Sequence, residues 1–463
     1  MIIWLNSLFI LSLPQINLIS KDMRRQIYEK LLQWKDAKDR KPLVLEGARQ
    51  VGKTYILKIF GEQEFENMIY INCHNNSFTQ TLFAQDFNIE RILRAISAYS
   101  GQSIKTGRTF IFLDEVQDSP RCMESLKYFC EEARDQHIAV AGSLLGIMDH
   151  EDESYPVGKI NTLQLFPMSF EEFLWAKNEE SKLEVLNNRD WDVIASLSSA
   201  YEDLLRQYYY VGGMPEVVLD YITNNDLKQV RQKQKEILRN YNNDFSKHAG
   251  NETQRIRMVW KSLPSQLAKD NKKFIYGAVK KGGRAKEFEK AIQWLVDAGL
   301  AYKIHRCLSP SMPLSVYEDP DAFKLYMLDV GLLGALSNMP AALMLINNDI
   351  FKESKGSFTE NYVLQELKNK EDIDIYYSSK DNSTQEIDFL VQIDTRIVPI
   401  EVKAEENVKS KSLRGFIVDD HADKHLKGLR CSMLQYRDQE WMENIPLYAV
   451  SAFFTHLSMV TTG

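Results

Sequence analysis

The residues with the clearest chemistry form the octet Gly-Ala-Arg-Gln-Val-Gly-Lys-Thr, which has the G-x-x-x-x-G-K-T spacing of a phosphate-binding loop. Gly47 and Gly52 allow backbone dihedrals that turn consecutive N–H groups toward an anion. The Lys53 amine can reach the β- and γ-phosphates, and the Thr54 hydroxyl can ligate Mg²⁺. A short apolar run precedes the octet and a helical pattern follows it, as such a loop requires. We therefore predict an ATP and Mg²⁺ site formed by Gly47, Ala48, Arg49, Gln50, Val51, Gly52, Lys53 and Thr54.

Two acidic residues, Asp114 and Glu115, follow directly after the apolar run 110–113. If that run is a strand of a parallel sheet, its carboxyl end lies beside the phosphate-binding loop. We expect Asp114 to hold Mg²⁺ through water and Glu115 to polarise the water that attacks the terminal phosphate. Ser143 follows the apolar run 137–141, and its hydroxyl could touch the γ-phosphate or that water. A Gly-Ser turn that caps the next helix is the alternative for Ser143.

A second group of charged residues lies near the C-terminal end. Glu360 falls on a helical pattern, Asp388 precedes an apolar run, and Glu401 and Lys403 alternate with apolar residues. Glu401 lies 13 positions beyond Asp388 (401 − 388), which leaves room for a hairpin that brings the two carboxylates side by side. Carboxylates suit a hard divalent cation, and a nearby lysine can activate water. The pattern predicts either a second divalent metal site or a solvated hairpin with alternating charges.

His421 and His425 are spaced i, i+4 on a predicted helix, with Asp419 and Asp420 upstream. Two such histidines could hold zinc, but no third ligand occurs at a fixed spacing. We interpret this segment as a polar surface helix.

The elements that must position the phosphate-binding loop alternate between strand and helix. Helical patterns separate most of the strand-like runs, and this alternation indicates βαβ units and a mainly parallel sheet. Near-continuous apolar strands fit a sheet that is covered on both faces. We assign residues 23–165 to an α/β P-loop domain whose strands are 42–46, 68–72, 109–113, 137–141 and 161–165.

Residues 166–250 read as a helical lid. Ser169 with Glu172 makes a capping box, and Pro215 suits the first turn of a helix that runs to about residue 222. The lid could sense nucleotide, or it could be a purely structural helical subdomain.

Residues 251–319 resemble a winged helix. A helical pattern from Ile256 is expected to end at Leu263, because Pro264 cannot continue it. A lysine-rich segment, a helix over 287–298 and a strand-like wing follow. Arg284 with these lysines would suit DNA phosphates, whereas a solvated basic face docked on the acidic remainder is the alternative. Residues 320–463 then form the C-terminal module.

Composition limits the protein class. The net charge of −7 argues against a protein coated in nucleic acid, and five cysteines without a C-x-x-C pair indicate reduced thiols in a cytoplasmic protein. Residues 1–22 are apolar, but polar residues interrupt them and no basic residue precedes them. We therefore expect neither a membrane span nor a secretory signal. Met23 is the expected true start, and a peripheral hydrophobic tail is the alternative.

The loop GARQVGKT, the strand end FLDEVQ and the segment AGSLL resemble the AAA-type, additional-strand P-loop ATPases of bacteria and archaea. The segments LFPMSFEEFL, YYYVGGMPEVV and KLYMLDVGLLGAL are similar to those of prokaryotic ATPases that carry a C-terminal domain of unknown function. The resemblance covers the chain from Met23 to its end. It implies that the octet binds nucleotide and Mg²⁺, that Asp114 and Glu115 fill the acidic-strand roles, and that Ser143 is the first sensor. Neither the arginine finger nor an oligomer is assigned by it, and Arg121, Arg206 and Arg255 all remain candidates for the finger.

The C-terminal pattern is similar to the restriction-endonuclease-like superfamily. That resemblance implies an α/β fold in which Glu360, Asp388 and Glu401 ligate metal and Lys403 is the catalytic lysine. We expect a cytoplasmic, Mg²⁺-dependent ATPase that couples nucleotide state to the winged helix and the nuclease-like module, acting on DNA or on a protein partner. Two alternatives stay open: a nucleotide-switched binding module with little turnover, and a metal-dependent DNA nuclease gated by ATP.

Overall fold

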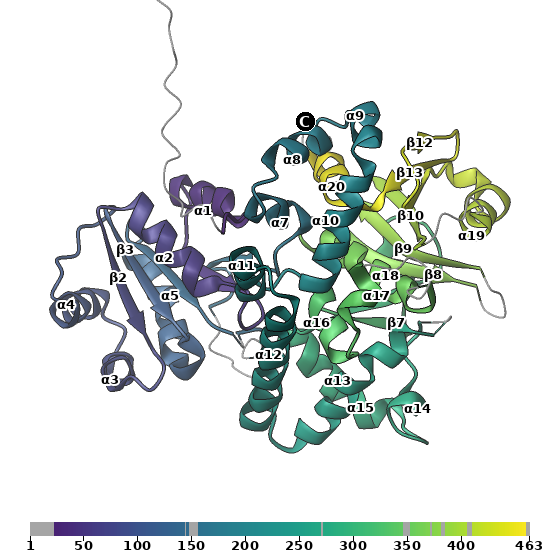
Figure 1. Ribbon diagram of the computed structural model, residues 1–463. Coiled ribbons are helices and arrows are strands. Elements are labelled where there is room, and N and C mark those ends of the chain that lie inside the picture. The colour runs from purple at the N-terminus through teal and green to yellow at the C-terminus, as the bar shows by residue number, and fades with distance from the viewer. Residues whose placement is uncertain are drawn as a thin grey trace, which may run out of the picture.

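The computed structural model describes residues 23–143, 145–147, 156–269, 272–345, 352–370, 373–380, 385–404 and 410–459 (Figure 1). The predictions for residues 1–22 lie outside this part of the chain. A five-stranded sheet organises the N-terminal part and an eight-stranded sheet the C-terminal part, with helices between and around them.

The N-terminal sheet is parallel throughout and has the strand order β2-β3-β4-β1-β5. All five strands expected from the sequence are present. The strand β4 lies between β1, which leads into the octet, and β3, which ends in Asp114. The predicted α/β fold with a parallel sheet is therefore confirmed for this part of the chain. The strands are β1 (Leu43–Glu46), β2 (Asn67–Asn72), β3 (Thr109–Asp114), β4 (His137–Ala141) and β5 (Asn161–Gln164).

Successive residues of β3 face two different cores, because side chains alternate along a strand. Phe110 and Phe112 belong to the core that includes residues of α1 and α2, whereas Ile111 and Leu113 pack with residues of α3, α4 and α5. The sheet is thus covered on both faces, as its apolar strands predicted. These helices are α1 (Ile27–Asp36), α2 (Lys53–Glu64), α3 (Ser77–Gln85), α4 (Ile89–Ser100) and α5 (Pro120–Glu132).

Residues 166–250 are helical. The predicted capping box is present, because Glu172 N donates to Ser169 Oγ (3.3 Å) and Ser169 N donates to Glu172 Oε2 (3.0 Å). Pro215 occupies the first turn of α11, as expected. The helices are α7 (Phe170–Ala176), α8 (Glu180–Asn187), α9 (Trp191–Ser196), α10 (Ser198–Val211), α11 (Pro215–Asn224) and α12 (Leu227–His248).

The connection between α10 and α11 docks on α16 (Val330–Leu336). Gly213 N donates to the buried Asp329 carboxylate at 2.6 Å, and Met168 N donates to Gly213 O at 2.6 Å. Asp329 also caps α16 by accepting from Leu332 N at 2.8 Å. Two segments that the sequence marks separately, YYYVGGMPEVV and KLYMLDVGLLGAL, therefore meet in one buried junction.

The helix α13 (Thr253–Leu267) continues through Pro264, so its expected end at Leu263 is wrong. Proline removes one backbone hydrogen bond from a helix. Trp260, Leu263 and Leu267 are fully buried, and this packing keeps the last turn helical. The helices α14 (Tyr276–Val279) and α15 (Ala285–Asp297) follow.

The strand expected as a wing is β6 (Ala301–Cys307), and it belongs to the C-terminal sheet. It pairs antiparallel with β7 (Glu318–Met327) and parallel with β8 (Ile373–Ser379). The boundary expected between residues 319 and 320 consequently falls inside β7. The sheet has the order β12-β13-β11-β10-β9-β8-β6-β7. Its other strands are β9 (Glu386–Ile393), β10 (Arg396–Val402), β11 (Gly428–Ser432), β12 (Arg437–Asp438) and β13 (Met442–Pro446).

The strands β9 and β10 form an antiparallel hairpin, as the spacing of Asp388 and Glu401 predicted. The helix expected to carry His421 and His425 is not formed. A π-helical segment, 415–420, ends before His421, and a single 3₁₀ turn separates the two histidines. Residues 421–425 are polar apart from one alanine, so they offer no apolar stripe by which a helix could pack on the protein. The remaining helices are α17 (Ala341–Leu345), α18 (Lys352–Lys368), α19 (Lys411–Arg414) and α20 (Val450–Met459).

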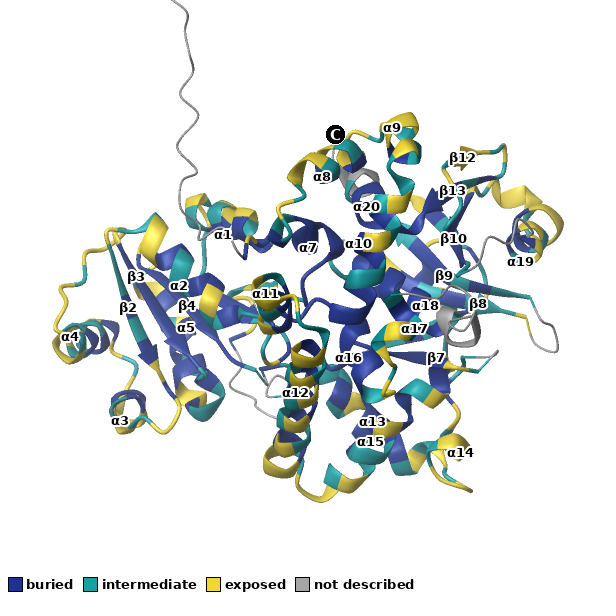
Figure 2. Ribbon diagram, in the orientation of Figure 1, coloured by how far each residue is buried: buried dark blue, intermediate teal, exposed yellow. Residues whose placement is uncertain are grey.

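One hydrophobic core joins the two halves. It includes Phe112 of β3, Tyr208 of α10 and Phe389 of β9, all fully buried. Figure 2 shows the buried residues along both sheets and along the helices between them. The five cysteines are buried and free, as predicted. Within the described ranges, no helix combines the length and apolar character needed to cross a membrane.

Candidate functional site

The octet folds into a loop between β1 and α2. Gly47 has a φ of 142°, and a Cβ there would lie 2.2 Å from the Leu165 carbonyl oxygen. Gly52 has a φ of 100°, a conformation that side-chain-bearing residues rarely adopt. Both glycines of the motif are therefore required by the loop conformation itself.

The Lys53 amine is held inside this loop. Lys53 Nζ donates to Gly47 O (2.7 Å) and to Ala48 O (2.8 Å). Burial lowers the pKa of Lys53 to about 8, because a charged amine is poorly solvated there. The loop thus presents a cation whose charge is lost at moderately alkaline pH.

Asp114 lies beside the first turn of α2. Thr54 Oγ1 donates to Asp114 Oδ2 at 2.8 Å, and Tyr70 Oη donates to the same oxygen at 3.2 Å. Burial raises the pKa of Asp114. A hydroxyl and a carboxylate placed side by side are hard oxygen donors of the kind that Mg²⁺ prefers. Thr54 and Asp114 therefore fit the predicted magnesium site.

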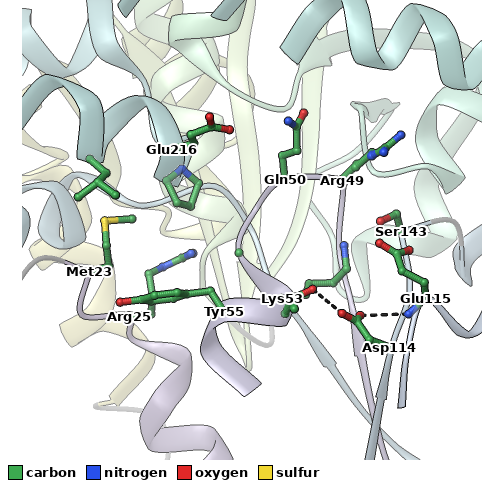
Figure 3. Close-up of a pocket in the computed structure, with 14 residues that line it drawn as sticks. Met23, Arg25, Arg49, Gln50, Lys53, Tyr55, Asp114, Glu115, Ser143 and Glu216 are labelled. Carbon is green, nitrogen blue, oxygen red and sulfur yellow. Dashed lines mark hydrogen bonds between the residues drawn. The ribbon is translucent and has the colours of Figure 1, made fainter. Parts of the chain in front are cut away.

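Glu115 follows Asp114 in a left-handed conformation, with a φ of 53°. Its carboxylate accepts a hydrogen bond from Gln117 Nε2 at 2.6 Å, and its backbone N–H donates to Asp114 Oδ1 at 3.0 Å. Ser143, after β4, lines the same cavity as Glu115 and Lys53 (Figure 3). The site residues that the sequence predicted after three separate strands therefore lie together in the folded protein.

These residues line a cavity of about 400 Å³. Its opposite wall is formed by α11, which contributes Pro215, Glu216 and Leu219. Met23 and Tyr55 add apolar surface. The helical segment therefore closes over the phosphate-binding loop. The sequence predicted a helical lid over residues 166–250, but it did not indicate that α11 is the part that faces the loop.

Arg25 was also missed. This buried side chain donates from Nη1 to Val51 O (2.8 Å) and from Nη2 to Phe166 O (2.7 Å), and its Nε lies 3.0 Å from Glu172 Oε2. Arg25 thus links the phosphate-binding loop, through Val51 O, to the capping box, through Glu172. No local pattern could reveal it, because its acceptors lie 26 and 141 residues away.

The three arginines considered as fingers do not line the cavity. Arg121 donates to Phe83 O, Arg206 pairs with Glu202 and Asp203, and Arg255 pairs with Glu252. Among the described residues, the arginines that do line it are Arg25 and Arg49.

The carboxylates expected to form a nuclease-like site lie among lysines. Glu360 is buried, pairs with Lys272 and accepts from Tyr326 Oη at 3.2 Å. Burial opposes ionisation of Glu360, but the charges of Lys272 and Lys324 outweigh it and lower the pKa of Glu360. Burial and the charge of Glu360 raise the pKa of Asp388. Lys324 is fully buried and pairs with Glu386.

Asp388 and Glu401 also have bonds within the hairpin. Asp388 Oδ2 accepts from Val402 N at 2.7 Å, and Glu401 lies 3.1 Å from Lys403 Nζ. Glu401 Oε2 has no hydrogen-bond donor among the residues that the structure describes. Even so, no group of three or more His, Cys, Asp or Glu side chains in the described part of the chain is placed to hold a metal ion. The predicted second metal is not supported, because lysines neutralise the carboxylates instead.

Three family models match parts of this chain. Residues 39–174 match an AAA domain, residues 202–343 a domain of unknown function (DUF8612), and residues 355–450 another domain of unknown function (DUF4143). The first match and the parallel five-stranded sheet identify an AAA-type P-loop domain. The last match does not describe a restriction-endonuclease-like domain, so that prediction is not confirmed.

A protein of Haemophilus influenzae described as uncharacterized is 24% identical over 205 residues, 42% of this chain and 44% of that protein. The match thus spans less than half of that relative. Among solved structures, a Walker-type ATPase of Pyrococcus abyssi is similar at 13% identity with a TM-score of 0.43, covering 68% of this chain and 96% of the other. An ORC1 protein of Aeropyrum pernix in complex with DNA is similar at 13% identity with a TM-score of 0.27, covering 70% and 93%. Both TM-scores are too low to support an inference about this chain.

The buried carboxylates Glu360 and Asp388 should depend on Lys324 for the stability of the fold. Lys324→Met should lower the free energy of unfolding by about 3–5 kcal/mol, because it leaves buried carboxylates without a counter-charge. Chemical denaturation measures this change, and the exposed Lys290→Met serves as the control. Adding Glu386→Gln should restore part of the loss. A loss no larger than that of the control would contradict a charge-balancing role.

Proposed function

We propose that this protein binds ATP with Mg²⁺ at the octet and hydrolyses it to ADP and phosphate. One observation carries the proposal: Lys53, Thr54, Asp114, Glu115 and Ser143 line a single cavity. The AAA-domain match to residues 39–174 supports it. The coupling of this site to the rest of the chain would pass through α11, which forms the facing wall.

Each residue has a role in the proposed reaction. Lys53 and the amides of the loop bind the phosphates, and Thr54 with Asp114 would hold Mg²⁺, which when bound neutralises charge on the phosphate oxygens. Glu115 orients the attacking water and accepts its proton. Gln117 holds the Glu115 carboxylate in place through its hydrogen bond. Ser143 donates to the γ-phosphate or to the water.

Two substitutions separate binding from turnover. Lys53→Ala should abolish ATP binding, because it removes the buried cation at the phosphates. Glu115→Gln should keep ATP binding but lower phosphate release by about 10²–10⁴-fold, since the amide accepts no proton. Phosphate release and nucleotide titration measure the two effects, with the exposed Glu62→Gln as control.

Unchanged phosphate release in both variants would contradict the proposed hydrolysis. Tight ATP binding without phosphate release in the wild type would instead favour the nucleotide-switched module with little turnover.

The lowered pKa of Lys53 predicts a pH dependence. Burial lowers this pKa to about 8, so the amine is charged at neutral pH and becomes neutral above pH 8. Bound phosphate favours the charged amine, and ATP binding above pH 8 therefore requires proton uptake. Affinity should fall by up to about tenfold per pH unit above that point. Titrations at neutral and alkaline pH test this expectation. Lys53→Arg, whose guanidinium keeps its charge, should show a smaller fall in affinity.

A second candidate function, DNA binding, is favoured by exposed cations at the start of α15. Lys281, Arg284, Lys286 and Lys290 are exposed, although the exposed Glu289 lies among them. Such side chains suit contacts with phosphates, which hold a protein on DNA without reading its sequence.

Charge reversal tests this second candidate. The triple variant Lys281→Glu, Arg284→Glu and Lys286→Glu should weaken binding to duplex DNA at least about tenfold and reduce its salt dependence. Fluorescence anisotropy at two salt concentrations measures both. The matched control reverses Lys38, Lys228 and Lys235, which are exposed elsewhere. Equal losses in the two triple variants would show only a non-specific effect of net charge.

A further inference from the structure

The phosphate-binding loop is tied to the end of α12 by one of its own side chains. Arg49 Nη1 lies 2.5 Å from Asp244 Oδ1 on α12, 195 residues away in the sequence. Tyr241 Oη on the same helix donates to Arg49 O at 2.9 Å. The last two turns of α12 therefore meet the octet.

The two partners of this ion pair differ in exposure. The Asp244 side chain is 9% exposed, whereas that of Arg49 is 46% exposed. Arg49 also lines the cavity that holds Lys53, Glu115 and Ser143, and it lies at the rim beside Gln50 (Figure 3). The carboxylate is thus largely enclosed by protein, whereas Arg49 both lines the cavity and holds its guanidinium, half exposed, against Asp244.

A guanidinium binds carboxylates and phosphates with the same forked geometry. Among the described residues that line the cavity, Arg25 is already committed to Val51 O, Phe166 O and Glu172. The side chain of Arg49 contacts one described acceptor, Asp244. Arg49 is therefore the cavity arginine that can take a further anion.

The end of α12 is packed against α13 and α15. Phe245 contacts the rings of Trp260 on α13 and Trp294 on α15, with centroid distances of 5.9 Å and 5.4 Å. Tyr241 also contacts Trp260, at 6.1 Å. A change in the hydrogen bonding of Asp244 would alter these aromatic contacts, because Tyr241 and Phe245 lie within one helical turn of Asp244.

We propose that the guanidinium of Arg49 is shared between Asp244 and the terminal phosphate of ATP, so that Arg49 distinguishes ATP from ADP and reports the difference to α12. This inference rests on the proposed function. A γ-phosphate competes with Asp244 for Arg49, whereas ADP offers no anion at that position. The coupling is reciprocal: binding of the γ-phosphate weakens the ion pair, and the ion pair weakens binding of the γ-phosphate.

Nucleotide titrations of the full chain with Mg²⁺ test the inference, using the non-hydrolysable analogue AMP-PNP against ADP. Arg49→Ala should weaken AMP-PNP about tenfold or more, the scale of one charge-assisted hydrogen bond, and ADP by less than about threefold. Asp244→Asn should strengthen AMP-PNP relative to ADP, because it frees Arg49. In the Arg49→Ala background, Asp244→Asn should change neither affinity. Unfolding midpoints of all variants establish that they fold.

Amide hydrogen exchange gives a second readout at α12. In the wild type, AMP-PNP should increase exchange over residues 241–248 and ADP should not. Equal loss of both nucleotides in Arg49→Ala, or weaker AMP-PNP binding in Asp244→Asn, would overturn the inference and leave the proposed function standing. A wild type that binds neither nucleotide would overturn both.

Discussion

The buried ion pair between Arg25 and Glu172 is the constraint on which the candidate site depends. Both side chains are only 4% exposed, and Arg25 also donates to a carbonyl of the loop and to Phe166 O. Loss of either partner leaves an unpaired charge in the interior, which costs several kcal/mol. The loop is therefore held by the segment that precedes α1 and by the cap of α7, and its geometry is a property of the assembled molecule.

Two groups of carboxylates are treated differently by this fold. Asp114 and Glu115 end a strand at an open cavity, where a hydroxyl and a lysine from the loop face them. Glu360 and Asp388 lie in the interior, where Lys272 and Lys324 supply the opposing charge. The first arrangement leaves room for an anionic ligand and its cation. In the second, side chains of the protein already supply the cations.

Features set by neighbouring residues could be predicted from the sequence, whereas features set by distant residues could not. The strands, the octet and the capping box depend on residues within a few positions of one another, and the sequence was sufficient for them. Lys324 was not associated with the carboxylates, because β6 and β8 separate β7 from β9 in the sheet and only the folded chain brings Lys324 to Glu386. The continuation of α13 through Pro264 has a similar cause, since local preference was overridden by burial of Trp260 and Leu267.

The membership of β6 in the C-terminal sheet also limits how the chain can be divided. The strand β6 is flanked by β7 on one side and β8 on the other. A shortened protein that stopped at the expected boundary would interrupt β7 and remove β8, leaving the backbone amides and carbonyls of β6 without their partners. Exposed strand edges of this kind recruit strands from other molecules. Excision of the C-terminal module would therefore expose β6 to such pairing and promote aggregation.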